Sequence, residues 1–339
     1  MSSMTSKERV LAALNLKEPD RVPWVETYIH KGLAETILGH PVAEQPGRAR
    51  IYPDIREALS LDNVFYNFSP PRFAEIERRG DMEIVGEGKL KTWEDLEACK
   101  KTMPDPTSKE FYKPAEEYFK KYGKDFATFA GVRMGPGNTY LSMGLEHFSY
   151  MLIDDPDLVD AVMDMFSSFT LKVLEVVQNM DFDVIHMADD LAFKTGTFIS
   201  PKHMERFFMP HMRKIAEKIE KPWIYHSCGN INSIFDTLLS LGMNSIANLE
   251  PGPMDIFQLK KDYAGKVCLT GNIDIHYTLS KGTPEETEAE VKEKIEKVAP
   301  GGGYMMASAN GLATYCKPEN VVAMNDALLK YGNYPIKSS

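Results

Sequence analysis

Cysteine is scarce in this sequence, which has Cys99, Cys228, Cys268 and Cys316 as its only four in 339 residues. So few thiols in so long a chain exclude a disulfide framework and favour a reducing, cytoplasmic setting. Long apolar runs are missing too, because no stretch approaches the roughly 18 consecutive apolar residues that a membrane span needs. The first residues, MSSMTSKERV, contain no apolar core of the kind found in secretion signals. We therefore expect a soluble, cytoplasmic protein.

Positive charge is not in excess either. The chain has 39 Lys and Arg residues against 49 Asp and Glu residues, and the charges are interspersed. This balance offers no electrostatic footprint for nucleic acid. The phosphate-binding patterns GxGxxG and GxxxxGKS/T are absent, which removes the common reasons to expect a nucleotide-binding sheet. Because no Gly/Ser-rich or Pro-rich linker divides the chain, one domain over residues 1–339 is expected.

Short apolar or β-rich segments alternate with amphipathic stretches along the chain. Helical patterns include 157–177, 201–219 and 284–298. Strands that alternate with helices imply parallel pairing, and eight such units over about 300 residues favour a (β/α)8 TIM barrel. The eight predicted strands are 21–26, 63–68, 126–131, 182–187, 223–225, 245–249, 266–270 and 303–307.

Two segments lie outside this repeating pattern. A helical extension precedes the first predicted strand. The stretch 70–124 is rich in charge and contains Pro104 and Pro106, so we expect an insertion of helices and loops between the second and third strands. Such an insertion can cover one mouth of the barrel, and the sequence leaves open whether it acts as a lid.

The tetrapeptide His226-Ser227-Cys228-Gly229 directly follows a predicted strand. Residues i and i+2 of an extended segment point to the same side, so the imidazole and the thiol can converge on one ion. Nitrogen and thiolate ligands suit Zn²⁺. The pair is short, however, and a buried histidine beside a small buried cysteine is the structural alternative.

Polar side chains follow most of the other predicted strands. In a parallel barrel the chemistry gathers at the carboxyl ends of the strands. A cluster of carboxylates there repels itself, and a divalent cation removes that cost. The alternative is that these side chains cap helices or line a solvated cleft. The residues are Glu26 and Tyr28, Asp189 and Asp190, Glu250, Asn272 and Asp274, and Ser308 and Asn310.

Other residues are candidates for completing a site. Cys316, after the last strand, is a further possible metal ligand. Arg133 stands among glycines and suits a carboxylate or phosphate, with a surface ion pair as the alternative. Tyr28, Phe193 and Tyr225 can form an apolar wall for an aromatic substrate, or belong to the core.

Together these motifs resemble the uroporphyrinogen decarboxylase superfamily over nearly the whole chain. The resemblance implies a (β/α)8 barrel. It also implies one of two activities, because the superfamily contains decarboxylases and cobamide-dependent methyltransferases. The matching segments are RVLAALNLKEPDRVP (9–23), DDLAFKTG (189–196), HSCGN (226–230), GNID (271–274) with GTPEE (282–286), and PEN (318–320).

The methyltransferase branch fits better than the decarboxylases. The decarboxylases carry an arginine-rich RQAGR motif after the first strand, where this chain reads VETYIH (25–30) with no arginine. The methyltransferases carry His-x-Cys-Gly, in which His and Cys bind zinc, and His226 and Cys228 match that motif. Uroporphyrinogen decarboxylation is therefore disfavoured.

The third zinc ligand differs from that of coenzyme M methyltransferases, which take it from a Gly-Cys-Gly turn after strand eight. Here that place reads SANG (308–311), without cysteine. Aromatic O-demethylase methyltransferases mix carboxylates with histidine, and one of their patterns is echoed by Asp190, fourteen residues, Glu205, twenty residues and His226. Glu250 is a competing ligand.

The resemblance implies methyl transfer from a methoxylated aromatic compound to the Co(I) corrinoid of a partner corrinoid protein, with zinc as a Lewis acid on the ether oxygen. Asp190, Glu26 or Tyr28 would assist by proton transfer, and Asn310 would lie against the substrate. Two alternatives stay open, a methylcobalamin:thiol methyltransferase and a non-catalytic barrel that binds a corrinoid or tetrapyrrole. No nucleic acid or membrane partner is expected, and a homodimer is left open.

Overall fold

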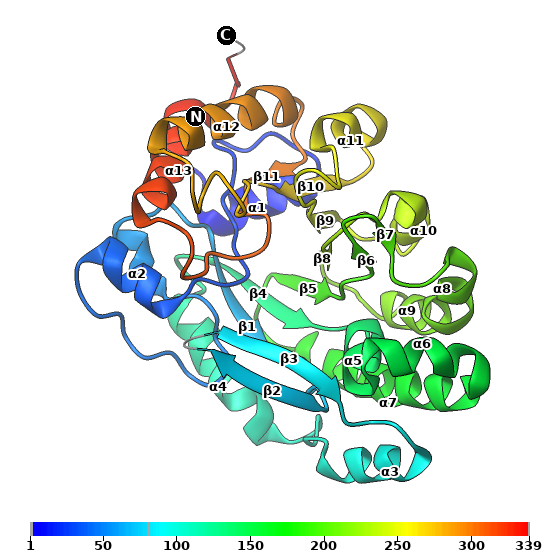
Figure 1. Cartoon of the computed structure of the whole chain (residues 1–339). Helices are drawn as coiled ribbons and strands as arrows, with labels where there is room; N and C mark the ends of the chain where they lie inside the picture. Colours follow the sequence, from blue (N-terminus) through cyan, green and yellow to red (C-terminus); the bar gives the residue numbers. More distant parts are fainter. Residues whose placement is uncertain (1–2, 80–81, 338–339) are drawn as a thin grey trace.

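The computed structural model describes residues 3–79 and 82–337, and a curled sheet of seven strands forms its centre (Figure 1). Every neighbouring pair in this sheet is parallel, and the strands follow one another in chain order. This is the arrangement expected for a barrel of β/α units. The strands are β1 (Asn63–Asn67), β4 (Ala127–Val132), β5 (Val184–Ala188), β8 (Trp223–Ser227), β9 (Ser245–Asn248), β10 (Cys268–Gly271) and β11 (Tyr304–Met305).

The predicted first strand, 21–26, is not a regular strand, so the sheet has seven strands where eight were predicted. On one side, Trp24 forms an isolated parallel bridge with Met306. Toward β1, the backbone N–H of Trp24 donates to Asp62 Oδ2 (2.9 Å), and that of Glu26 donates to Asn63 Oδ1 (2.8 Å). Side chains thus replace part of the backbone ladder, which is why the segment connects β11 to β1 without forming a strand.

Helices cover the outer side of the sheet, and their ends follow from local sequence. Thr283 and Glu286 form a capping box at the start of α12, and Asp155 caps α7 by accepting from the backbone N–H of Leu158. The predicted helix 201–219 is two helices, because Pro210 opens a new one. The helices after β4 are α5 (Pro136–Met143), α6 (Leu145–Asp154), α7 (Pro156–Val177), α8 (Pro201–Phe207), α9 (Met209–Ala216), α10 (Phe235–Leu239), α11 (Ile256–Tyr263), α12 (Pro284–Val298) and α13 (Pro318–Tyr331).

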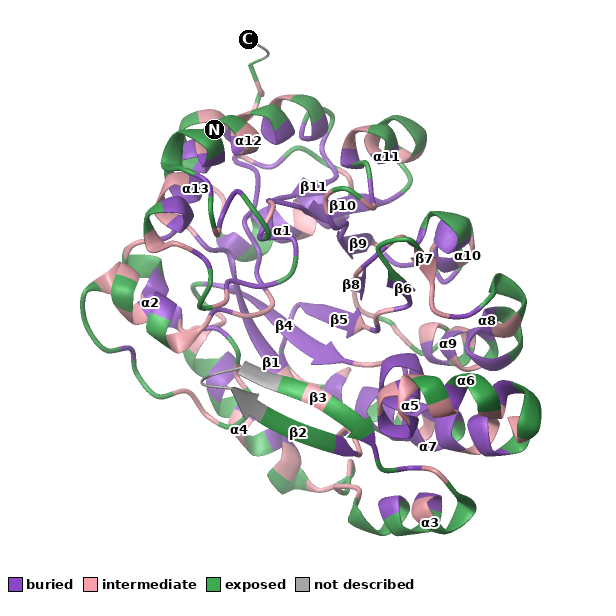
Figure 2. Cartoon of the chain, in the orientation of Figure 1, coloured by how far each residue is buried: buried purple, intermediate pink, exposed green. Residues whose placement is uncertain are grey.

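The insertion at 70–124 contains a β-hairpin as well as helices. Strands β2 (Ala74–Arg79) and β3 (Met82–Gly88) pair antiparallel, and α3 (Trp93–Thr102) and α4 (Lys109–Tyr122) follow them. The expectation of helices and loops alone was therefore wrong. The hairpin stands in front of the sheet and is largely exposed (Figure 2). Charged residues are frequent in both strands, which hid the strand pattern in the sequence.

Shorter elements complete the chain. Before β1 lie α1 (Ser6–Leu14), α2 (Lys31–Leu38) and the 3₁₀ helix η1 (Pro53–Glu57). The two-residue strands β6 (Ala192–Phe193) and β7 (Gly196–Thr197) and the 3₁₀ helix η2 (Asn232–Ile234) lie near β8. Among the described residues, no helix has the length and apolarity that crossing a membrane requires.

Candidate metal centre

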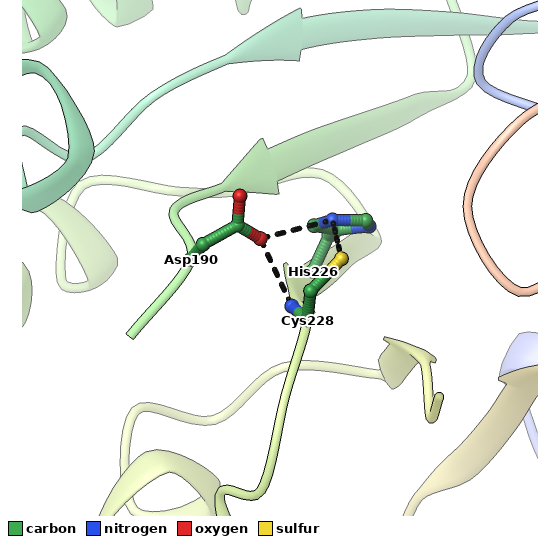
Figure 3. A group of neighbouring side chains, drawn as sticks. All are labelled: Asp190, His226 and Cys228. Atoms are coloured by element: carbon green, nitrogen blue, oxygen red, sulfur yellow. Dashed lines mark hydrogen bonds and ion pairs between the residues drawn. The ribbon is translucent and has the colours of Figure 1, made fainter. Parts of the chain in front are cut away.

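Three ligand-bearing side chains converge where β5 and β8 end. Asp190 follows β5, His226 lies near the end of β8, and Cys228 comes directly after β8. His226 Nε2 is 3.5 Å from Cys228 Sγ and 3.5 Å from Asp190 Oδ1 (Figure 3). Within residues 3–79 and 82–337, no other three His, Cys, Asp or Glu side chains bring ligand atoms within 4.8 Å of one another.

The backbone holds this geometry from both sides. The backbone N–H of Cys228 donates to Asp190 Oδ1 (2.9 Å), which fixes the carboxylate against the turn. Gly229 has a φ of 80° and lies so close to the β6 segment that a Cβ would meet the carbonyl oxygen of Ala192 at 2.3 Å. Only glycine allows both features. The turn that aims Cys228 at His226 therefore depends on Gly229.

The three residues fit a zinc ion. Tetrahedral zinc holds nitrogen, oxygen and sulfur ligands at about 2.0 to 2.3 Å, so its ligand atoms lie about 3.4 to 3.6 Å apart. The separations of 3.5 Å around His226 Nε2 meet that spacing as they stand. One nitrogen, one oxygen and one sulfur also leave a fourth position for a substrate atom. The donor set and the two separations around His226 Nε2 are thus compatible with a zinc ion.

The charges of this group depend on its neighbours. Burial opposes ionisation of Asp190, but the hydrogen bond and charge of His226 hold the pKa of this carboxyl below its ordinary value. Burial raises the pKa of Cys228 well above the ordinary value for a thiol, and the negative charge of Asp190 adds to the effect. A carboxylate therefore lies beside a protonated thiol in the metal-free protein. A metal that binds Cys228 must displace that proton, because the thiolate is the ligand.

Asn310 contacts the sulfur from the loop after β11. Its Nδ2 lies 3.6 Å from Cys228 Sγ and donates toward it. Its backbone carbonyl oxygen accepts from Thr27 Oγ1 (3.2 Å) and Asn248 Nδ2 (3.0 Å), which anchors the loop. This is the place where the resemblance leads one to expect a cysteine ligand. Here a neutral amide occupies it, and Asp190 supplies the anionic third group from the other side.

The other predicted metal ligands lie outside this group. Glu250 is buried and bonds to Gly229 N–H and to His276 Nε2. Glu205 lies on the outer surface of α8, where both carboxylate oxygens accept from Arg213 (2.6 and 3.0 Å). Cys316 is buried in the loop after β11, and burial raises its pKa to about 11.

The predicted proton-transfer residues occupy different surroundings. Glu26 is buried and accepts hydrogen bonds from Trp24 Nε1 (2.8 Å) and from both the N–H and the hydroxyl of Ser308. Burial raises the pKa of Glu26 to about 7. Tyr28 lines the cavity beside the metal centre. Asp190, also predicted to transfer protons, lies among the candidate ligand atoms.

A cavity of about 1230 Å³ opens above Asp190 and His226. Among the predicted substrate-binding residues, Tyr28, Arg133 and Asn310 line it. Phe193 is instead half-exposed in the β6 segment. Tyr225 is completely buried, and its hydroxyl donates to the backbone carbonyl of Asp189 (3.3 Å), so it supports the site from within the core.

Sequence reasoning missed His186, which lies in β5 below the metal centre. Its ring centroid is 5.9 Å from that of His226, and both of its ring nitrogens are buried without a partner among the described residues. Burial lowers the pKa of His186 well below the ordinary value, so the ring is neutral. The alternation of a strand, counted back from Asp190 through Ala188, could have identified it.

Three arginines of the cavity were also missed: Arg48, Arg50 and Arg72. Arg48 and Arg50 come from the irregular segment before β1, and Arg72 precedes the hairpin. No periodic pattern marks these segments as part of a site. Arg133 was predicted because it follows a strand.

Comparison with known proteins places this geometry in a family. A family model described as uroporphyrinogen decarboxylase (URO-D) matches residues 82–331. A methylcobamide:CoM methyltransferase, MtbA, of Methanosarcina mazei is 24% identical over 354 residues, covering 98% of this chain and 99% of the relative. A methylated-thiol–coenzyme M methyltransferase of the same organism is 20% identical over 152 residues, covering 45% of this chain and 40% of the relative.

A solved structure also shares the fold. A methyltransferase from Methanosarcina mazei superimposes with a TM-score of 0.74 at 20% sequence identity, covering 97% of this chain and 99% of that chain. The likeness supports the barrel architecture from one end of the chain to the other.

Proposed function

This chain belongs to the uroporphyrinogen decarboxylase (URO-D) family, and we propose that it is a zinc-dependent methyltransferase that works with a corrinoid protein. The observation that carries the proposal is the convergence of Asp190, His226 and Cys228, of which Asp190 and His226 line a cavity of about 1230 Å³. Curated relatives are named methylcobamide or methylated-thiol methyltransferases, which supports methyl transfer. Decarboxylation of a tetrapyrrole would not explain why three side chains of the kind that bind metal ions lie together here.

The methyl donor we propose is a methoxylated aromatic compound. Zinc held by Asp190, His226 and Cys228 would supply a Lewis acid to the ether oxygen. A carboxylate donates less electron density than a thiolate, so a site with one thiolate keeps more Lewis acidity than a site with two. Asn310 supports this difference, because it stands beside Cys228 Sγ as a neutral amide and adds no second thiolate. The donor set therefore favours ether cleavage over activation of a thiol.

The residues of the chain have separate tasks in this proposal. The backbone N–H of Cys228 orients the carboxylate of Asp190. Neutral His186 keeps the floor below His226 free of added charge. Tyr28, which lines the cavity, provides the proton for the departing aryl oxide. A Co(I) corrinoid carried by a partner protein would supply the acceptor for the methyl group, and the aryl oxide, once protonated, would leave as a phenol.

A second candidate is methyl transfer from methylcobalamin to a thiol. It is favoured by the names of both curated relatives, which are coenzyme M methyltransferases. In this reaction the thiol acceptor, and not an ether, would take the open position of the metal. A non-catalytic barrel that binds a corrinoid is the remaining alternative.

The test runs both reactions with zinc-loaded protein and free cobalamin. We expect methoxybenzene derivatives and cob(I)alamin to yield methylcobalamin, followed by its visible absorbance. Cys228→Ser should slow this reaction by at least about 100-fold, because it removes a metal ligand. Cys316→Ser is the matched control, since that buried thiol lies outside the three-residue group, and it should retain the rate.

Each other outcome selects an alternative. Methylation of a thiol by methylcobalamin, with no ether cleavage, would select the second candidate. Binding of cobalamin without either reaction would contradict methyl transfer. Release of CO₂ from uroporphyrinogen would restore the decarboxylase assignment.

A further inference from the structure

The cavity above the metal centre carries a large surplus of positive charge. Five cationic side chains line it, and Asp190 is the only carboxylate in the lining of the described chain. Lys31 is paired with Glu44, and Arg133 lies 3.8 Å from Asp189 below the cavity floor. The cationic residues are Lys31, Arg48, Arg50, Arg72 and Arg133.

Two of these five cations, Arg50 and Arg72, are not paired through their side chains with a described residue. Neither makes a hydrogen bond or ion pair through its side chain with any residue that the structure describes. Burial lowers the pKa of Arg72 to about 10, and the positive charges of Arg133 and Arg50 lower it further. Burial also lowers the pKa of Arg50, again with Arg133 as the next cause. The guanidinium groups therefore repel one another inside the cavity. The charge of Asp190 offsets only part of this repulsion at Arg72, and an entering anion would relieve the rest.

Hydrogen bonds hold the backbone of Arg50 beside the cavity. The backbone N–H of Arg50 donates to Phe65 of β1 (2.9 Å), and its carbonyl accepts from Ile29 (3.1 Å). Arg48 and Arg50 flank Ala49, which forms an isolated bridge with Tyr66, and both arginines line the cavity. Arg48 is partly neutralised, because its Nη1 donates to the carbonyl of Ser69 (2.6 Å). The charge surplus thus lines the cavity, with Arg48 and Arg50 exposed and Arg72 half-buried.

Apolar groups stand beside the arginines. Ile76 of β2 and Ile84 of β3 line the same cavity with 46% and 37% of their surface exposed, and Phe65 and Tyr52 line it too. An inorganic anion would leave these apolar surfaces in water. A ligand that carries both an anionic group and a hydrocarbon ring can pair with the arginines and also cover the apolar side chains.

We propose that the small substrate of this cavity is an organic anion, an aromatic acid whose carboxylate is held by Arg50 and Arg72. The inference rests on the proposed function, because it names the substrate class of the same site. The carboxylate pairs with the guanidinium groups, the ring packs against the hairpin, and the methoxy group reaches the metal centre. A thiol bearing a sulfonate is the other source of the same anionic chemistry.

The test compares charged and neutral probes by calorimetric titration of the zinc-loaded protein. 4-Methoxybenzoate should bind at least about tenfold more tightly than its neutral methyl ester. Arg72→Gln and Arg50→Gln should each remove most of that difference and leave the affinity for the ester unchanged. Arg213→Gln, on the outer surface and paired with Glu205, is the control and should change neither affinity. The pair 2-mercaptoethanesulfonate and 2-mercaptoethanol tests the sulfonate source in the same way.

A second readout separates binding from structure. Removing one of several repelling charges should raise the melting temperature of ligand-free Arg72→Gln above that of the parent protein. A marked fall in melting temperature would show a structural role and overturn the inference. Equal affinity for acid and ester, or an acid affinity that survives both substitutions, would overturn it too.

The two proposals fail in different ways. Methyl transfer from neutral methoxyarenes at the rate of the acids would keep the proposed function and remove this inference. Tight, arginine-dependent binding of the acid with no methyl transfer from any donor would keep the inference and remove the proposed function.

Discussion

At the scale of single residues, the metal centre depends on short-range geometry that the sequence partly encodes. His226 and Cys228 were predicted as a pair because they lie two positions apart at a strand end, and the structure brings their ligand atoms to 3.5 Å. Asp190 was predicted for proton transfer and lies among the ligand atoms. Its direction toward His226 depends on the relative position of β5 and β8, which no local pattern specifies.

Arg50 and Arg72 show the limit of sequence reading. They come from irregular segments, where no repeat of apolar residues indicates which way a side chain points. Only the folded chain brings them to the cavity with Arg133. Glu205 shows a different limit. Its spacing in the sequence matched a family pattern of metal ligands, but it lies on the surface of α8 and pairs with Arg213.

Glu26 gives a residue-scale prediction about pH. Its pKa rises from 4.5 to about 7 on folding, so the folded protein holds this proton more tightly than the unfolded chain does. The unfolded chain ionises first as the pH rises, which lowers the free energy of unfolding between about pH 4.5 and pH 7. Glu26→Gln cannot ionise. Its stability relative to the parent protein should therefore increase by about 2 to 3 kcal/mol between pH 5 and pH 8.

Urea unfolding of both proteins at the two pH values measures this difference. The comparison cancels the other titrating groups that the two proteins share. A difference in stability that stays constant from pH 5 to pH 8 would contradict the buried, proton-holding environment of Glu26.

At the scale of elements, the closure between β11 and β1 depends on Asp62. Its carboxylate accepts from Arg9 Nη1 (2.6 Å), from Arg21 Nη2 (3.0 Å) and from the backbone N–H of Trp24 (2.9 Å). Its side chain is 1% exposed. One buried residue thus ties α1 and the 21–26 segment to β1. This explains why that segment keeps its position without a regular ladder of hydrogen bonds.

Asp62→Ala should lower the free energy of unfolding by about 3 to 5 kcal/mol, because it leaves buried guanidinium and N–H groups without their acceptor. Asp164→Ala, at an exposed position of α7, should change it by less than about 0.5 kcal/mol. Chemical denaturation with a two-state fit measures both values. A loss below about 1 kcal/mol in Asp62→Ala would show that other groups hold the closing segment.

The elements themselves were predictable to different degrees. Buried strands such as β5 and β8 are mostly apolar, and α7 and α12 begin at clear caps, so these elements were predicted close to their observed positions. The β2–β3 hairpin was missed because charged residues surround its few apolar ones, such as Ile76 in β2 and Ile84 in β3. The predicted strand at 21–26 was wrong because side chains of Asp62 and Asn63 take the place of strand hydrogen bonds.

At the scale of the whole molecule, the barrel brings chemistry from distant parts of the chain to one cavity. The candidate metal ligands come from strand ends. The arginines come from segments before β1, before the hairpin and after β4, and the hairpin adds apolar side chains. The fold class could be read from the alternation of strands and helices. The cavity could not, because it forms where irregular segments meet.

Metal content tests the central claim most directly. Protein purified without added zinc and analysed by mass spectrometry should contain about one zinc per chain, in the parent and in the Cys316→Ser control. His226→Ala and Cys228→Ser should lose that zinc while their circular dichroism spectra stay unchanged, because both side chains lie at the mouth of the barrel. Metal-free parent protein that keeps full methyl-transfer activity after chelation, or a full zinc complement in both ligand variants, would contradict the account.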